Sequence, residues 1–169
     1  VLVTGAGPIG MLAALVGVQN GLDVHVLDRA ADGAKPRLVR DLVGTYHFGG
    51  IGDLGFQPDA VIECTGAGSL IIDSIRQVAS GGVVCLTGVG SGGSASGLSP
   101  ADMGKEIVLR NNVVLGSVNA NRRHFYKAAE ALAAADRTWL GQLISRRVAP
   151  GNIADALQRE TAKGRLAAA

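Results

Sequence analysis

The chain has 169 residues, of which 47% are hydrophobic and 25 are glycine. This length and apolar content suit one globular domain with a buried core and exclude an intrinsically disordered chain. The formal net charge of +2 is too small to favour binding to nucleic acid or to a membrane surface. No apolar stretch approaches the roughly 20 residues of a membrane-spanning helix, and no signal peptide precedes the first predicted strand.

Two cysteines, Cys64 and Cys85, fall within predicted buried strands. They lack the spacing of zinc ligands, so we expect small core residues in a reduced, cytoplasmic protein and no metal site in this chain. The chain begins directly on a predicted core strand, which indicates a domain cut from a longer polypeptide.

Taken in order along the chain, the apolar pattern predicts strands that alternate with helices. The strands are expected at 1–4, 22–28, 45–47, 60–64, 83–87 and 113–118, with a brief one at 147–148. The helices are expected at 8–20, from near Pro36 within 32–42, and at 69–79, 100–110, 122–135, 138–144 and 152–158. Glycine-rich connections occupy 49–58 and 88–99, and residues 163–169 are weakly patterned.

Two of these helices have an apolar face that we expect to be buried. On helix 8–20 it comprises Met11, Leu12, Leu15 and Val16, and on helix 122–135 it comprises Phe125, Ala128, Ala129, Leu132 and Ala133. Helix 100–110 has a clear start, because Ser99 is a favourable N-cap and Pro100 suits the first helical position.

Alternation of strands and helices predicts an α/β fold with a parallel sheet and right-handed crossovers. The expected architecture is a doubly wound, Rossmann-type sheet of strand order 3-2-1-4-5-6 with helices on both faces. We expect residues 1–136 to form this domain and residues 137–169 to form a helical extension that packs on it. A ligand would then lie across the carboxyl ends of the first and fourth strands, where the strand order reverses.

The first turn carries the motif Gly5-Ala6-Gly7-Pro8-Ile9-Gly10 between a strand and a helix. Gly5 permits the sharp turn, Gly7 lets the backbone approach a pyrophosphate, and Gly10 allows close packing of helix on sheet. Pro8 suits the start of a helix whose unpaired amides and dipole favour an anion. The motif predicts dinucleotide binding, although a doubly wound protein that binds a methyl donor is an alternative.

Asp28 ends the second predicted strand, where a carboxylate accepts hydrogen bonds from the ribose diol of NAD. It would repel the 2′-phosphate of NADP by about 4 kcal/mol at 4 Å and an effective dielectric constant of 20. The neighbouring Arg29 could offset this repulsion, so the two effects nearly cancel. We prefer NAD, with NADP as the alternative.

Polar turns follow the fourth and fifth strands at Thr65-Gly66 and Thr87-Gly88-Val89. They lie where a nicotinamide ribose and ring would bind, although ordinary turn chemistry explains them as well. The three histidines, His25, His47 and His124, are scattered and are expected to be structural. The basic pairs 122–123 and 146–147 are expected to be solvated or to contact another subunit.

Several segments resemble one enzyme family, the glucose dehydrogenases of the zinc-dependent medium-chain dehydrogenase superfamily. They are V-T-G-A-G-P-I-G, V-H-V-L-D-R, V-I-E-C-T-G, L-T-G-V and, most specifically, G-S-V-N-A-N-R-R-H-F at 116–125. The resemblance extends from Val1 to about Ala156. It implies a two-domain subunit in which a GroES-like catalytic domain, absent from this chain, holds the zinc. That zinc polarises the anomeric hydroxyl of an aldose, and hydride transfer from C1 to the nicotinamide gives the lactone.

The resemblance also implies roles for individual residues, while no residue of this chain is implied as catalytic or metal-binding. Pyrophosphate contacts are implied for Gly5, Gly7, Pro8, Ile9 and Gly10, and adenosine-ribose contacts for Asp28 and Arg29. Nicotinamide-side contacts are implied for Thr65, Gly66, Leu86, Thr87 and Val89, and Asn119 would contact both cofactor and sugar. The resemblance further implies a homo-oligomer, a dimer or tetramer, in which the sixth strand pairs with a copy of itself. The chain departs from the family at Lys163-Gly164-Arg165-Leu166, where alanines replace a final apolar strand.

Three alternative functions remain open at this stage. The chain could belong to another medium-chain enzyme, such as a polyol dehydrogenase or a quinone reductase. It could be a non-enzymatic nucleotide-sensing module, or it could be a methyltransferase. The specific run 116–125 favours the sugar dehydrogenase.

Overall fold

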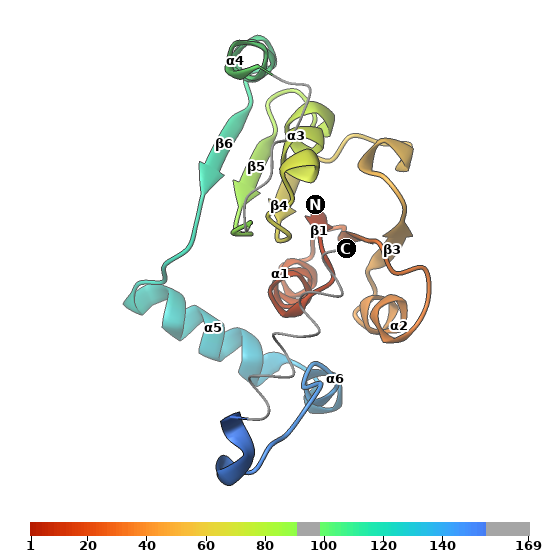
Figure 1. Ribbon diagram of the computed structural model, residues 1–169, viewed down its shortest axis with the longest axis vertical. Helices are drawn as coiled ribbons and strands as arrows, with labels where there is room; N and C mark the ends of the chain where they lie inside the picture. Colours follow the sequence, from red (N-terminus) through yellow and green to blue (C-terminus); the bar gives the residue numbers. More distant parts are fainter. Residues whose placement is uncertain (91–98, 155–169) are drawn as a thin grey trace. The chain divides into compact units, whose positions relative to one another are not determined.

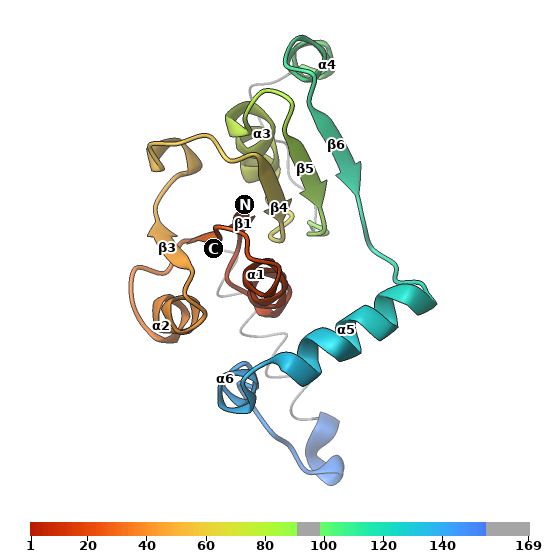
Figure 2. The ribbon, with the colours of Figure 1, turned by 180° about the vertical axis from the view of Figure 1, so that it is seen from behind.

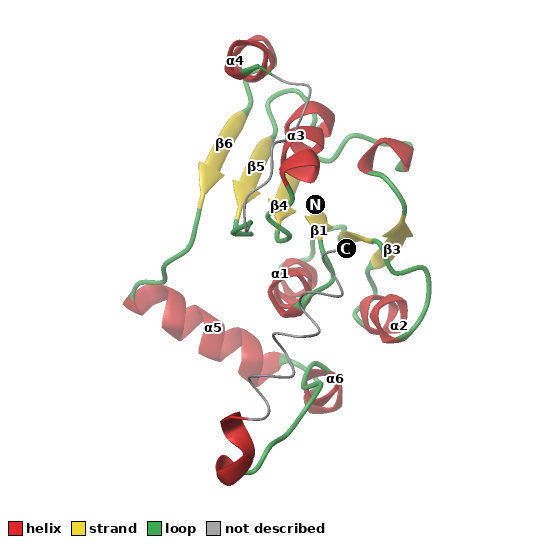
Figure 3. Cartoon of the chain, viewed as in Figure 1, coloured by secondary structure: helices red, strands yellow, loops and turns green. Residues whose placement is uncertain are grey.

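A computed structural model of the chain describes residues 1–90 and 99–154. Its centre is a six-stranded parallel sheet in the order β3-β2-β1-β4-β5-β6 (Figures 1 and 3). The predicted α/β class and strand order are confirmed. The chain divides into two compact units, Val1–Asp136 and Arg137–Ala169.

The elements alternate along the first unit as expected. The strands are β1 (Leu2–Thr4), β2 (His25–Asp28), β3 (Thr45–Phe48), β4 (Ala60–Glu63), β5 (Val83–Leu86) and β6 (Val113–Gly116). The helices are α1 (Pro8–Gln19), α2 (Ala34–Asp41), α3 (Gly68–Gln77), α4 (Pro100–Leu109) and α5 (Arg122–Ala134), with a 3₁₀ turn, η1, at Ile51–Asp53. In the second unit the described elements are α6 (Arg137–Gln142) and a 3₁₀ turn, η2 (Pro150–Asn152).

Helices cover both faces of the sheet because successive strand residues point to opposite sides. Leu2 and Val61 point to one face, where they cluster with Ile75 of α3. Val3 points to the other face and lies beside the start of α1, where a Cβ added at Gly10 would be 3.3 Å from its side chain. Figure 2 shows the same sheet from behind, with β6 and α4 at one end and β3 and α2 at the other.

One predicted boundary, the start of the second strand, shifts for a local reason. The second strand begins at His25 rather than at residue 22 because Leu22 lies in the turn that ends α1, where its amide donates to the carbonyl of Gly17 at 3.1 Å. Helix α4 begins as predicted, with the Ser99 hydroxyl accepting from the amide of Asp102 at 3.1 Å. The glycine-rich stretch 49–58 contains η1, which the sequence analysis did not expect.

The predicted strand at 147–148 is wrong, because these residues form no ladder within the described part of the chain. Most of the predicted helix 152–158 lies outside the described residues, as do the last residues, 163–169.

The predicted burial of helix faces is half right for α1 and wrong for α5. In α1, Met11 and Leu15 are buried, whereas Leu12 and Val16, one position further round the helix, are exposed by 38% and 44%. None of the predicted inward residues of α5 is buried, and Phe125 is 69% exposed. Periodicity identifies residues that share a helix face, but it does not show that another element covers that face.

The turn from β1 into α1 depends on two glycines. Gly5 has φ of +91°, a conformation that side chains strongly disfavour. Gly10 lies so close to this turn that an added Cβ would be 1.8 Å from the carbonyl oxygen of Gly5. The first turn of α1 is therefore pressed directly against the end of β1.

We expect Gly10→Ala to lower the free energy of unfolding by about 3 kcal/mol, because the new methyl group cannot fit without moving backbone. Urea denaturation measures the effect. Gly104→Ala is the matched control, since an added Cβ there meets nothing within 4 Å and lies in the interior of α4. This control should be neutral or stabilising by up to about 1 kcal/mol. Equal effects of the two substitutions would contradict the close approach of α1 to β1.

Candidate functional site

The predicted site residues lie at the carboxyl ends of five parallel strands. The glycine motif follows β1, Asp28 ends β2, Thr65 follows β4, Leu86 ends β5 and Asn119 follows β6. Because all strands of a parallel sheet end at the same edge, the topology brings these segments together (Figure 1).

The first turn presents backbone amides at the start of α1. No backbone hydrogen bond within the described residues engages the amides of Ile9 and Gly10. Gly7 has ordinary backbone angles, and an added Cβ there would meet nothing within 4 Å. Folding alone therefore does not require glycine at position 7, whereas close approach of an anion to these amides does.

Asp28 joins β2 to the glycine motif. One carboxylate oxygen, Oδ2, accepts from the amide of Ala6 at 2.7 Å, and the other, Oδ1, accepts from the amide of Ala30 at 3.0 Å. Lys35 of α2 donates to both oxygens, at 2.9 and 3.0 Å. Burial alone would raise the pKa of Asp28, but the hydrogen bonds from Lys35, Ala30 and Ala6 outweigh it and lower the pKa.

Tyr46 of β3 supports the segment after Asp28. Its hydroxyl donates to the carbonyl of Ala30 at 2.6 Å. Burial and the negative charge of Asp28 raise the pKa of Tyr46 to about 12, so the hydroxyl keeps its proton and remains a donor. The neighbouring residue, Arg29, is exposed.

Glu63, at the end of β4, is fully buried and organises the next turn. Its carboxylate accepts from the amide of Thr65 at 2.8 Å, from the amide of Gly66 at 3.0 Å, and from the hydroxyls of Thr65 and, at 3.4 Å, Thr4. These donors compensate a buried negative charge without an ion pair among the described residues. Glu63 therefore holds the Thr65-Gly66 turn in place.

The turns after β4 and β5 are in direct contact. An added Cβ at Gly88 would lie 2.1 Å from the amide nitrogen of Gly66. Thr87 reinforces the contact, because its hydroxyl donates to the carbonyl of Glu63 at 2.8 Å. The two polar turns predicted from the sequence, at Thr65-Gly66 and Thr87-Gly88-Val89, thus form one continuous wall.

A cleft of about 770 Å³ opens beside this wall, which is within the usual size range of small-molecule sites. It is lined by Ile9, Cys64, Thr65, Thr87, Gly88, Val89, Ser117, Val118, Asn119, Ala120 and His124. The structure therefore brings five predicted site residues into one cleft: Ile9, Thr65, Thr87, Val89 and Asn119. The remaining predicted residues do not line it: Gly5, Gly7, Pro8, Gly10, Asp28, Arg29, Gly66 and Leu86.

Three residues of the site were missed by sequence reasoning. No sequence pattern pointed to Lys35, because its contact with Asp28 depends on the position that α2 takes in the folded chain. The sequence did contain a signal for Glu63, because an acidic residue at the end of an apolar strand needs hydrogen-bond donors around it when it is buried. His124, expected to be structural, lines the cleft, and its Nδ1 accepts from the amide of Asn121 at 3.3 Å.

The other two histidines have the structural role that was expected. His25 and His47 are hydrogen-bonded at 2.8 Å, and both rings pack against Phe56. Burial, with a smaller contribution from His25, lowers the pKa of His47, which favours its neutral form.

The described residues do not fit a metal centre. They contain no group of three or more histidine, cysteine or acidic side chains arranged to hold a metal ion. Burial raises the pKa of both Cys64 and Cys85, so their thiols remain protonated and are poor metal ligands.

The described helices include none that is long and apolar enough to cross a membrane.

Residues 1–166 match the sequence model of the family described as Glucose dehydrogenase C-terminus. The chain belongs to this family. It is 38% identical to glucose 1-dehydrogenase 2 of Vulcanisaeta moutnovskia, over 92% of this chain and 45% of the relative. It is 41% identical to glucose 1-dehydrogenase of Thermoproteus tenax, over 80% of this chain and 39% of the relative. The chain thus spans less than half the length of these two relatives.

Solved structures agree with this assignment. Glucose dehydrogenase of Haloferax mediterranei superimposes with a TM-score of 0.73 and 27% identity, over 83% of this chain and 42% of that chain. One structure of the Haloferax enzyme is a complex with NADP, zinc and gluconolactone. The resemblance to glucose dehydrogenases inferred from the motifs is confirmed.

We expect Glu63→Gln to lower the free energy of unfolding by about 1–3 kcal/mol, because an amide nitrogen would face backbone donors in place of a carboxylate oxygen. Urea denaturation at neutral pH measures the loss. Glu106→Gln is the matched control, since Glu106 is exposed on α4. An equally small effect of both substitutions would argue against the role of Glu63.

Proposed function

We propose that this chain is the coenzyme-binding half of a zinc-containing dehydrogenase that oxidises an aldose to its lactone with NAD or NADP. The observation that carries the proposal is that the amides of Ile9 and Gly10, at the start of α1, have no backbone partner among residues 1–90 and 99–154, beside an open glycine at position 7. Family membership supports the same reading. In this proposal residues 1–136 bind the dinucleotide and residues 137–169 are a C-terminal extension of that domain.

The chain's own residues bind and orient the coenzyme. The turn from Gly5 to Gly10, which leads into α1, holds the pyrophosphate through backbone amides and the dipole of that helix. The segment after β2, with Asp28 and Arg29, contacts the adenosine ribose. The nicotinamide half lies along the wall formed by the turns after β4 and β5, with contacts from Thr65, Gly66, Leu86, Thr87 and Val89. When bound, the coenzyme supplies the hydride acceptor.

Asn119 contributes to the sugar side of the cleft. Its amide can donate to one hydroxyl and accept from another, so it can orient a sugar against the nicotinamide ring. Substrate activation requires the zinc, and the described residues do not form a site for it. We therefore assign the metal ligands to a catalytic domain outside this chain.

The proposal includes a cytoplasmic location and a homo-oligomer. The half-buried, protonated thiols of Cys64 and Cys85 suit a reducing compartment. Strand β6 pairs only with β5 among the described strands, and its Val113 and Leu115 are exposed by 51% and 41%. An unpaired edge of this kind favours pairing with a second copy of the strand.

We expect Gly7→Ala to weaken coenzyme binding by at least about tenfold while lowering stability by no more than about 1 kcal/mol. The methyl group has room in the protein itself but would occupy the space nearest the pyrophosphate. Calorimetric titration with NAD and NADP measures affinity, and thermal unfolding measures stability. Unchanged affinity for both coenzymes would contradict the proposed phosphate site, and binding of a methyl donor instead would indicate a different enzyme class.

In the full-length protein, we expect Asn119→Ala to raise the KM for the sugar or to lower kcat by about tenfold, which is the loss of one or two hydrogen bonds. Steady-state kinetics with glucose measure both constants. Asn20→Ala is the control, because Asn20 is exposed and lies after α1, at the far end of that helix from the glycine motif. Unchanged kinetics of the Asn119 variant would refute its role.

A further inference from the structure

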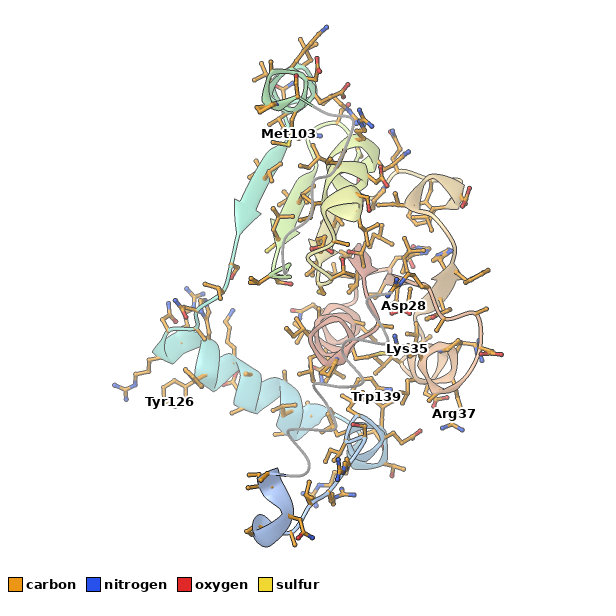
Figure 4. The ribbon with its side chains drawn as sticks, in the orientation of Figure 1. Asp28, Lys35, Arg37, Met103, Tyr126 and Trp139 are labelled. Atoms are coloured by element: carbon orange, nitrogen blue, oxygen red, sulfur yellow. The ribbon has the colours of Figure 1, made fainter. Side chains whose placement is uncertain are left out.

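Strand β2 ends at Asp28, whose carboxylate is expected to bind the ribose. In the structure this carboxylate forms an ion pair with Lys35. Lys35 Nζ lies 2.9 Å from Oδ2 and 3.0 Å from Oδ1 of Asp28. Figure 4 shows the two side chains beside each other, between the end of β2 and the start of α2. The Asp28 side chain is 12% exposed, whereas that of Lys35 is 42% exposed.

The hydrogen-bonding capacity of Asp28 is already used. A carboxylate offers about four acceptor positions. One oxygen takes the amide of Ala6 and one proton of Lys35, and the other takes the amide of Ala30 and a second contact from Lys35. The hydroxyl groups of a ribose diol, which must donate to this carboxylate, would therefore have to displace the lysine.

A phosphate group has the opposite requirement. It offers only acceptors, and an ammonium group has three donor protons, of which Asp28 engages two. With respect to the described residues, the exposed side of Lys35 therefore retains a donor and a positive charge beside the expected ribose position. Because Lys35 also neutralises Asp28, the carboxylate no longer repels a nearby anion as it would alone.

We propose that Lys35 is a specificity-determining residue that adapts this site to the 2′-phosphate of NADP. The inference rests on the proposed function, since it assumes that a nicotinamide dinucleotide binds across β1 and β4. It reverses the preference for NAD that Asp28 alone suggests. The full-length protein should bind NADP at least as tightly as NAD.

The test is calorimetric titration of the full-length protein and its variants with NADP and with NAD. Lys35→Met should weaken NADP binding by about 10- to 100-fold, the value of one charge-assisted hydrogen bond. The same substitution frees acceptor positions on Asp28, so NAD binding should stay equal or become tighter. Lys35→Arg, which keeps the charge, should retain most of the affinity for NADP.

Lys105→Met is the matched control, because it removes the same charge from an exposed position on α4. It should leave both affinities unchanged. Carboxyl NMR provides a readout independent of the coenzyme, since the pKa of Asp28 should rise in Lys35→Met.

The outcomes separate the two hypotheses. If the unsubstituted protein binds neither coenzyme, the proposed function fails. If it binds both and Lys35→Met changes the two affinities equally, or if it prefers NAD strongly, the proposed function stands and the role of Lys35 is refuted.

Discussion

Two carboxylates, at the ends of the two strands that flank β1, hold the carboxyl edge of this sheet together. Asp28 ends β2 and accepts from Ala6 of the glycine motif, while Glu63 ends β4 and accepts from the turn at Thr65 and Gly66. Between them lies β1, which pairs with both strands. A buried or half-buried carboxylate is stable only when donors surround it, so each of these acids fixes the backbone that supplies its donors.

This arrangement divides the backbone amides at the edge into two groups. The amides of Ala6, Thr65 and Gly66 are used internally and give the loops a fixed shape. Helix geometry leaves the amides of Ile9 and Gly10, in the first turn of α1, without an intrahelical partner, and no other backbone group of the described residues engages them. A ligand that binds there meets donors that are already oriented, so little conformational entropy is lost on binding.

Much of this could be predicted from the sequence because it depends on local rules. The tight turn at Gly5 and Gly10, the alternation of strands and helices and the cap at Ser99 each depend on a few residues, and all three are confirmed. The sequence could not show that the apolar side of α5 is uncovered, with Phe125 69% exposed, because burial depends on a partner element. It also could not show that Lys35 reaches Asp28, since that contact depends on where α2 begins.

The same distinction explains why coenzyme preference is difficult to infer from the motif alone. An acid after the second strand favours a ribose diol only if its acceptor positions are open. In this chain the acid supports the loop through Ala6 and Ala30 and is paired with a lysine from the following helix. In the proposed coenzyme site, the charge of Asp28 would then stabilise the loop rather than select the ligand, and the half-exposed Lys35 would be the charged group beside the ribose. The identity of the residue after β2 is therefore less informative than the set of partners that surround it.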